Sequence, residues 1–152
     1  MSNIQDFIIE PLDSSRHRRE KFDCGVAPLN DFLRSRARKE MESGTSACFV
    51  ILPEDEPNTV AGYYTLSIAT ILRTTLPESV TKKLPRYNEL PAILLGRLAR
   101  DLSFKGKQIR DQLMVSVLHR AGHPRKWHHG PSSPIRRMTG QRSSMQALAF
   151  NH

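Results

Sequence analysis

A continuous apolar run, Ala92–Leu95 (AILL), passes into an alternating stretch that ends at Asp101. A strand that is covered on both faces has such a run. The basic loop LSFKGK follows, and then IRDQLMVSVLHRA, in which Ile109, Leu113, Val117 and Leu118 form one helical face with Met114 beside it. A strand, a short glycine-containing loop and a helix together present free backbone N–H groups and the positive end of a helix dipole to a phosphate. The segment therefore predicts an anion-binding loop between a central strand and a helix.

The rest of the chain predicts short strands mixed with helices. The β-rich run before Leu12 contains Pro11, which suits a strand near a sheet edge. Apolar residues then recur at helical spacing after Pro28, and Ser43-Gly44 ends that helix. The expected elements are strands over 6–12, 47–53 and 60–72, a helix over 28–41 and a brief helix over 77–84. The second and third strands form an antiparallel hairpin across the acidic turn EDEPN.

Length and composition indicate a soluble protein with one domain. The 152 residues are 38% hydrophobic and 25% charged, and every apolar run is much shorter than the roughly 20 residues of a membrane helix. The N-terminus has neither a basic region nor a long apolar core, so we expect a cytoplasmic protein without a signal peptide. Two separate cysteines, Cys24 and Cys48, do not make a disulfide scaffold, and we expect buried thiols.

The charge is unevenly distributed along the chain. All 15 acidic residues lie between Asp6 and Asp111, and no acid follows Arg120. Of the net charge of +8, the first 120 residues carry +3 and the last 32 residues carry +5. A basic chain of this kind favours a nucleic acid or another anionic partner.

Several separate stretches, in order, resemble one enzyme family. FDCGVAPLNDFL, the helix after it, AGYYTLS, PRY and LLGRLARDLSFKGK are similar to the GNAT N-acetyltransferases, and more narrowly to the GNAT toxins of bacterial toxin–antitoxin pairs. The similarity covers about Phe7 to Ala121. It implies an α/β (α+β) fold with a mixed, mostly antiparallel sheet, flanking helices and an incomplete C-terminal part.

The resemblance also implies the reaction and its site. An acetyl group would pass from acetyl-CoA to a primary amine, which in the toxin branch is the amino acid carried on charged tRNA. The strand that ends at Leu98 to Arg100 would hydrogen-bond the pantetheine arm, and the loop after it would hold the pyrophosphate. The matching cofactor-binding residues are Leu98, Ala99, Arg100, Lys105, Gly106, Lys107, Gln108, Ile109 and Arg110. Catalysis would come from positioning and from a general acid that protonates the departing thiolate.

The loop departs from the family pattern at two positions. Gln108 and Arg110 stand where the pattern Arg/Gln-x-x-Gly-x-Gly/Ala has small residues. Glycine lets a backbone approach a phosphate closely, and a long side chain at Arg110 occupies that space. An extra cation could instead help to hold the phosphate. We expect weaker cofactor binding.

The sequence after Ala121 does not continue the family pattern. Residues 122–152 lack acids and sustained periodicity, so we expect a basic tail without a packed face behind a truncated domain over 1–121. The Phe-Tyr stretch that carries the family's general acid is missing, which leaves the catalytic residue unknown and predicts little or no activity. Read from the third base of each codon, one back-translation of the tail gives a strand, a helix and a Phe-Tyr-Ala-Ser-Leu-Gly-Phe stretch. We therefore hypothesise that a frameshift within the gene produced the sequence after Ala121.

Other interpretations remain open for several residues. Arg34, Arg38 and Lys39 could contact tRNA or form a solvated helix face. Of Tyr63 and Tyr64, on opposite faces of one strand, at least one belongs to the core, and the other could line the acceptor cleft. Arg97 and Arg100 could bind phosphate or pair with acids. We do not expect Asp101 to be a general base, since capping or a turn explains its place near a strand end equally. The four histidines His119, His123, His128 and His129 predict no metal site, because glycine and proline interrupt their helix.

The partners and the competing functions follow from the same resemblance. A toxin of this type would have a small DNA-binding antitoxin, and a homodimer remains open; no membrane is expected. A non-catalytic basic remnant that binds RNA or the antitoxin is the main alternative function. A GNAT enzyme acting on protein or small-molecule amines is a third.

Overall fold

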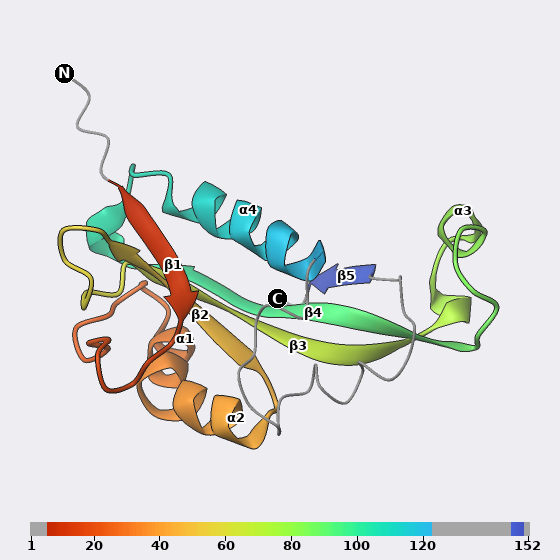
Figure 1. Ribbon diagram of the computed structural model, residues 1–152, viewed down its shortest axis with the longest axis horizontal. Helices are drawn as coiled ribbons and strands as arrows, with labels where there is room; N and C mark the ends of the chain where they lie inside the picture. Colours follow the sequence, from red (N-terminus) through yellow and green to blue (C-terminus); the bar gives the residue numbers. More distant parts are fainter. Residues whose placement is uncertain (1–5, 123–146, 151–152) are drawn as a thin grey trace.

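The computed structural model describes residues 6–122 and 147–150, which form a five-stranded sheet with helices on both faces (Figure 1). The strands are β1 (Phe7–Pro11), β2 (Ala47–Pro53), β3 (Gly62–Leu72), β4 (Glu89–Arg100) and β5 (Ala147–Phe150). The helices are α1 (Ala27–Asp31), α2 (Ala37–Ser43), α3 (Glu78–Thr81) and α4 (Ile109–Gly122). A π-helical turn, Phe32–Arg36, joins α1 to α2, and 3₁₀ turns cover Arg73–Thr75 and Leu102–Phe104.

The sheet has the order β1-β2-β3-β4-β5. β1, β2, β3 and β4 pair antiparallel with one another, and β5 lies parallel to β4. This confirms the predicted α/β fold with a mixed, mostly antiparallel sheet. The sequence places Ala147–Phe150 in a tail outside the sheet, whereas the structure pairs these four residues with Ala92–Leu95.

One face of the sheet packs against α4. Ile109, Leu113 and Val117 of the helix are buried against a cluster that includes Phe49 and Tyr64. The prediction of a core-facing helix is confirmed for these three side chains. It is wrong for Leu118, which is 58% exposed because it follows Val117 directly and so points away from the buried face.

The opposite face packs against α1, α2 and the π-helical turn. Phe32, Leu33 and Ala37 are buried there together with Val50 and Tyr63. Because side chains alternate along a strand, neighbouring residues of β2 and β3 supply the two separate core clusters. The helix ends at Gly44, whose φ of +76° is the left-handed conformation that glycine adopts without strain.

The outer edge of β1 is protected, as its proline predicts. Pro11 has no backbone N–H, and the guanidinium of Arg120 in α4 donates to the outward-facing carbonyl of Ile9 at 3.4 Å. These two features leave fewer free groups on which another strand could pair.

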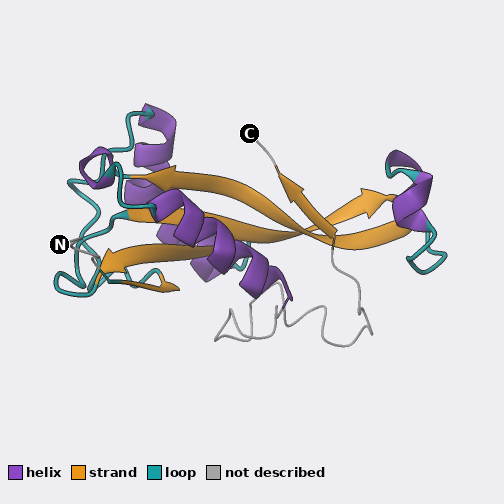
Figure 2. Cartoon of the chain, turned by 90° about the horizontal axis from the view of Figure 1, so that it is seen from above, coloured by secondary structure: helices purple, strands orange, loops and turns teal. Residues whose placement is uncertain are grey.

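β3 and β4 extend beyond β1 and β2 as an arm, and β5 pairs with the part of β4 nearest the rest of the sheet (Figure 2). The pairing of β2 with β3 ends at Ala47 and Leu66, whereas β3 and β4 continue to the pair Leu72 and Glu89. Residues 73–88, called the arm tip below, connect the two strands and contain α3. β4 thus begins three residues before the strand that the sequence predicts from Ala92.

Candidate active site

A β-bulge lies in the middle of β4. Arg97 pairs with Thr65 and Leu95 pairs with Leu66, so Gly96 has no residue opposite it. A Cβ atom at Gly96 would lie 3.0 Å from the hydroxyl oxygen of Thr65. The pairing of β5 stops at Leu95, immediately before the bulge. A bulge bends a strand and can end its pairing along one edge, so this one marks where the outer edge of β4 becomes free. Residues 97–100, called the free end below, stay paired with β3 along their inner edge. No local sequence pattern predicts the bulge.

The free end of β4 exposes backbone groups along its outer edge. The Asp101 amide donates to the Ala61 carbonyl at 2.8 Å. This bond shows which residues of β4 direct their backbone N–H and C=O groups toward β3 and which direct them away from it. In an antiparallel ladder, the groups of Leu98 and Arg100 then face away from β3. Along this outer edge, no described strand pairs with β4 at Leu98 or Arg100, because β5 pairs only with Ala92–Leu95. An extended ligand could form hydrogen bonds there in the manner of an additional strand.

Asp101 anchors the turn after β4. Its carboxylate accepts hydrogen bonds from the Ser103 amide at 2.9 Å, from the Ser103 hydroxyl at 2.6 Å and from the Asp23 amide at 2.9 Å. These bonds confirm the predicted structural role of Asp101. They also attach the loop around Asp23 to the end of β4, a contact over 78 residues of sequence that no local pattern predicts.

Hydrogen bonds also order the loop around Asp23 itself. The Gly25 amide and the Asn30 side chain donate to Asp23, and these two bonds, in that order, lower the pKa of its carboxyl. The sequence offered a signal here in the stretch FDCG, which the family resemblance includes.

The loop between β4 and α4 provides backbone donors for an anion. The first backbone hydrogen bond of α4 runs from the Gln112 amide to the Gln108 carbonyl. The amides of Ile109, Arg110 and Asp111 lie before Gln112 and therefore have no acceptor within the helix. Lys105 and Arg110 are exposed beside them. Aligned amides, the helix dipole and nearby cations suit a phosphate group.

Two loop residues adopt the left-handed conformation. Gly106 has a φ of +83°, and Gln108, at the first replaced glycine position, has a φ of +58°. Gln108 therefore adopts the backbone conformation that glycine would adopt here, and its Cβ atom gives this conformation a steric cost. The Nζ of Lys107 lies 5.5 Å from the centroid of the Phe104 ring. Ile109 is buried and anchors the loop to the core.

The two arginines of β4 are placed differently. The guanidinium carbon of Arg97 lies 3.7 Å from the centroid of the Phe32 ring, on the face that α1 and α2 cover. Arg100 lies on the other side of the strand, and its buried Nε has no hydrogen-bond partner among residues 6–122. Neither arginine forms an ion pair with a described acid. Only Arg100 therefore remains a candidate ligand for an anion at the β4 edge.

Both central tyrosines are buried. The hydroxyl of Tyr63 donates to the Leu29 carbonyl at 2.7 Å, and the hydroxyl of Tyr64 lies 2.7 Å from that of Ser116. Burial raises the pKa of each phenol above its ordinary value. The prediction of opposite faces is confirmed, but the suggestion that one of them lines an acceptor cleft is wrong, because both have no exposed surface.

The predicted RNA-contacting cations of the helix are exposed, and two of them have intramolecular partners. Arg34 donates to the carbonyls of Arg19 and Phe22, and Arg38 pairs with Glu42 at 2.9 Å. The bond to Glu42 raises the pKa of Arg38. Lys39 is exposed. The solvated-face alternative therefore accounts for Arg34 and Arg38 at least as well as RNA contact does.

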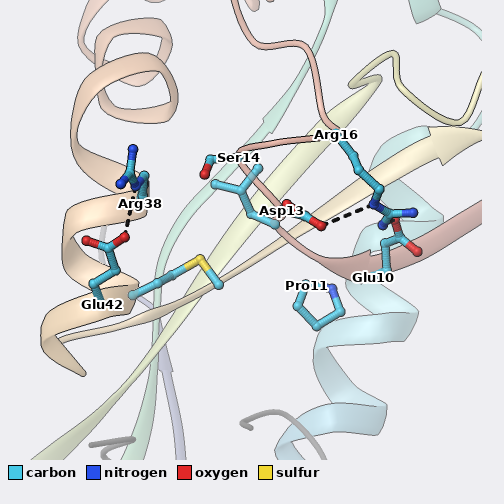
Figure 3. Close-up of a pocket in the computed structure, with 9 residues that line it drawn as sticks. Glu10, Pro11, Asp13, Ser14, Arg16, Arg38 and Glu42 are labelled. Atoms are coloured by element: carbon cyan, nitrogen blue, oxygen red, sulfur yellow. Dashed lines mark hydrogen bonds and ion pairs between the residues drawn. The ribbon is translucent and has the colours of Figure 1, made fainter. Parts of the chain in front are cut away.

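A separate groove of about 480 Å³ lies between α2 and the connector after β1 (Figure 3). Arg38 and Glu42 line one side, and Arg16 pairs with Asp13 at 3.2 Å and also with Glu10 on the other. Its charges are already matched within the protein. It also has no predicted cofactor residue in its lining.

The remaining sequence predictions concern metals, thiols and membranes. Residues 6–122 contain no group of three or more potential metal ligands; His123, His128 and His129 lie outside the described residues. Cys24 and Cys48 are free thiols, and burial raises the pKa of Cys48, whereas Cys24 is partly exposed rather than buried. None of the helices in the described part of the chain is long and apolar enough to cross a membrane.

Comparison with known proteins finds relatives that are described as toxins. The chain is 31% identical over 113 residues to a probable toxin TacT of Sinorhizobium fredii, which covers 74% of this chain and 62% of that protein. It is 31% identical over 99 residues to a tRNA-acetylating toxin of Mycobacterium tuberculosis, which covers 65% of this chain and 57% of that protein. The chain thus spans about three fifths of the length of these curated relatives. No model of a protein family matches the sequence.

Solved structures agree with these relatives. A crystal structure of a tyrosine-to-phenylalanine mutant of KacT matches with a TM-score of 0.67 and 31% identity, over 76% of this chain and 68% of that one. AtaT complexed with acetyl-methionyl-tRNAfMet matches with a TM-score of 0.67 and 29% identity, over 75% and 68%. AtaTR bound with acetyl-CoA matches with a TM-score of 0.62 and 30% identity, over 75% and 67%.

Proposed function

Because this chain belongs to the toxin branch of the GNAT N-acetyltransferases, we propose that it binds acetyl-CoA and transfers the acetyl group to the amino acid of a charged tRNA. The observation that carries the proposal is the free edge of β4 at Leu98 and Arg100, which leads directly into the loop with free amides before α4.

The described residues fit a ligand with an extended arm and a pyrophosphate. The outward backbone groups of Leu98 and Arg100 would hydrogen-bond the pantetheine amides, and the amides of Ile109 and Arg110 would hold the pyrophosphate. Lys105 would offset part of its charge. When bound, acetyl-CoA supplies the acetyl group as a thioester that an amine can attack directly, so no cysteine nucleophile is required.

The acceptor is proposed from the relatives. One of them is a tRNA-acetylating toxin, and AtaT has been solved with acetyl-methionyl-tRNA. The competing acceptors are amines of proteins or small molecules. A comparison of charged with deacylated tRNA separates them, since only charged tRNA presents the free α-amino group.

We propose slow turnover for this form of the protein. Within the described residues, Tyr63 and Tyr64 are buried and hydrogen-bonded, and Tyr87 lies in the arm tip, so none can protonate a thiolate at the edge of β4. Without a general acid, we expect a rate about 10²–10⁴-fold below that of an enzyme that has one. If turnover is absent, the alternative is a non-catalytic protein that still binds RNA or an antitoxin.

The two-part organisation also remains a proposal. We place a truncated acetyltransferase domain over 1–121 and a basic tail, derived from a shifted reading frame, over 122–152. Most of that tail lies outside the described residues. The coding DNA tests the proposal directly: bases that cannot encode the Phe-Tyr stretch in the alternative frame would disprove it.

The proposed partners and location are those of a toxin. The relatives include AtaT bound to the C-terminus of the antitoxin AtaR, which supports a small antitoxin as a partner here. We also propose a cytoplasmic location and leave a homodimer to be tested by sedimentation.

Two measurements on the purified chain test the function. In the first, acetyl-CoA should raise the unfolding temperature, whereas acetyl-pantetheine, which lacks the pyrophosphate, should raise it much less. The variant Lys105→Ala, which removes the cation proposed to offset the pyrophosphate charge, should lose part of this difference, and Arg18→Ala, which removes one exposed cation elsewhere, should keep it.

In the second, transfer of labelled acetyl from acetyl-CoA is followed with charged and deacylated tRNA as acceptors. Slow labelling of charged tRNA alone is expected. No stabilisation by acetyl-CoA would exclude the cofactor site, and equal labelling of both RNAs would exclude the proposed acceptor.

A further inference from the structure

The arm tip, residues 73–88, is strongly basic. It contains Arg73, Lys82, Lys83 and Arg86 against the single acid Glu78. Arg73 is used within the tip, where its guanidinium donates to the carbonyls of Thr81 and Pro85.

The other three cations, Lys82, Lys83 and Arg86, are exposed and form no ion pair with an acid in the described parts of the chain. They stand within five consecutive residues and repel one another. The nearby acids Glu78 and Glu89 are outnumbered, so this surface has a net positive charge and suits an anionic partner.

An exposed aromatic side chain adjoins these cations. Tyr87 follows Arg86 directly, and 67% of its surface is exposed. Packing in the core therefore does not account for an aromatic residue at this position. Aromatic rings beside cations are the usual means by which proteins bind unpaired bases next to phosphates. An acidic peptide would use the cations but would leave the ring without a role. The combination therefore favours a nucleic acid with an unpaired segment.

The position of the tip indicates how large the partner is. β4 begins at the tip and ends beside the proposed acetyl-CoA loop, so the two sites lie at opposite ends of one strand (Figures 1 and 2). From Glu89 to Leu98 the strand rises roughly 30 Å, at about 3.3 Å per residue. A small amine cannot span this length, whereas an RNA that carries an amino acid at its end can.

We propose that the arm tip binds the RNA substrate, with Lys82, Lys83 and Arg86 on phosphates and Tyr87 stacked on an unpaired base. The choice of charged tRNA rests on the proposed function; the RNA-binding surface itself does not. This surface differs from the helix cations named in the sequence analysis, of which Arg34 and Arg38 have intramolecular partners.

The test measures the affinity of the full chain for tRNA, charged and deacylated, at several salt concentrations and without acetyl-CoA. The variant Lys82→Ala, Lys83→Ala should weaken binding about 10- to 30-fold at 0.15 M salt and lower the slope of log K against log salt by about 2. Tyr87→Ala should weaken binding about 5-fold or more without changing that slope. The control Arg18→Ala, Lys21→Ala removes the same charge from the connector and should bind within twofold of the unaltered chain.

A structural role for the lysines is tested separately, because Lys82 directly follows α3 and can favour its C-terminal end. Lys82→Arg, Lys83→Arg keeps both charges and should restore binding. The unfolding temperature should be the same in all variants. Tip variants that bind like the unaltered chain, a control that loses as much as they do, or a loss of binding explained by a lower unfolding temperature would each overturn the proposal.

Acetyl transfer is measured in parallel and distinguishes the two proposals. A chain that transfers no acetyl group but loses RNA binding in the tip variants would contradict the proposed function alone. A chain that acetylates charged tRNA while the tip variants bind normally would contradict the arm-tip proposal alone.

Discussion

At the residue scale, the backbone of Gln108 is the clearest departure from an ordinary loop. An L-residue with a φ of +58° is strained by roughly 1–2 kcal/mol, part of which glycine's greater freedom in the unfolded chain offsets. Gln108→Gly should therefore raise the free energy of unfolding by about 0.5–1 kcal/mol. Urea unfolding measures the change.

The same loop contains a control of opposite sign. Gly106 has a φ of +83° and no atom within 4 Å of its missing Cβ, so Gly106→Ala adds backbone strain without a clash. It should lower the free energy of unfolding by about 1 kcal/mol. If both variants shift stability in the same direction, backbone strain at Gln108 is not the cause.

The carboxyl of Asp23 gives a prediction in pH. Its pKa is lowered below 3.8, first by the Gly25 amide and then by the Asn30 side chain. A carboxyl with a lowered folded-state pKa stabilises the fold above its unfolded pKa, and this contribution is lost as the pH falls through the folded value. In an NMR titration, Asn30→Ala should move the pKa of Asp23 upward, while Ser35→Ala, which changes an exposed helix residue, should leave it unchanged. An unchanged pKa in Asn30→Ala would show that the hydrogen bond is unimportant.

At the scale of elements, β3 must lie very close to the free end of β4. A Cβ atom at Gly62 would lie 2.8 Å from the carbonyl oxygen of Ala99 and 3.1 Å from side-chain atoms of Ile51 and Ile109. Gly62→Ala should therefore cost roughly 1–3 kcal/mol of stability and disturb the edge at Leu98. Chemical denaturation tests this, with Gly122→Ala as the control, since nothing lies within 4 Å of a Cβ there. Equal stability of the two variants would show that the strands can move apart.

Elements with strong local patterns could be predicted from the sequence. The hairpin of β2 and β3, the edge position of β1 and the helix face of Ile109, Leu113 and Val117 all follow from periodicity and proline. The loop before α4 was also predicted from its residues, but the resemblance was needed to connect it with a cofactor.

Features that depend on distant contacts could not be predicted. The bulge at Gly96 arises from the register with Thr65, and the attachment of Asp23 to Asp101 joins segments 78 residues apart. The burial of both Tyr63 and Tyr64 depends on helices that cover the two faces of the sheet, which an alternating pattern alone does not reveal.

At the scale of the whole molecule, the positive charge is concentrated in the C-terminal part of the sequence. Replacing the five basic residues after Arg120 with glutamine reduces the net charge from +8 to +3. Because attraction to polyanions scales with the neutralised charges, this variant should elute from heparin at clearly lower salt. Elution at the same salt would show that the domain itself carries the anion-binding surface.

The hydrogen bond from Arg120 to the Ile9 carbonyl has a consequence for synthesis on the ribosome. It joins residues 111 positions apart, so the outer edge of β1 is complete only after nearly the whole domain has been translated. At about 5–20 residues per second, the nascent strand waits roughly 6–22 s for its partner. During that interval its edge can pair with neighbouring chains, and chaperones that bind extended segments would find their substrate there.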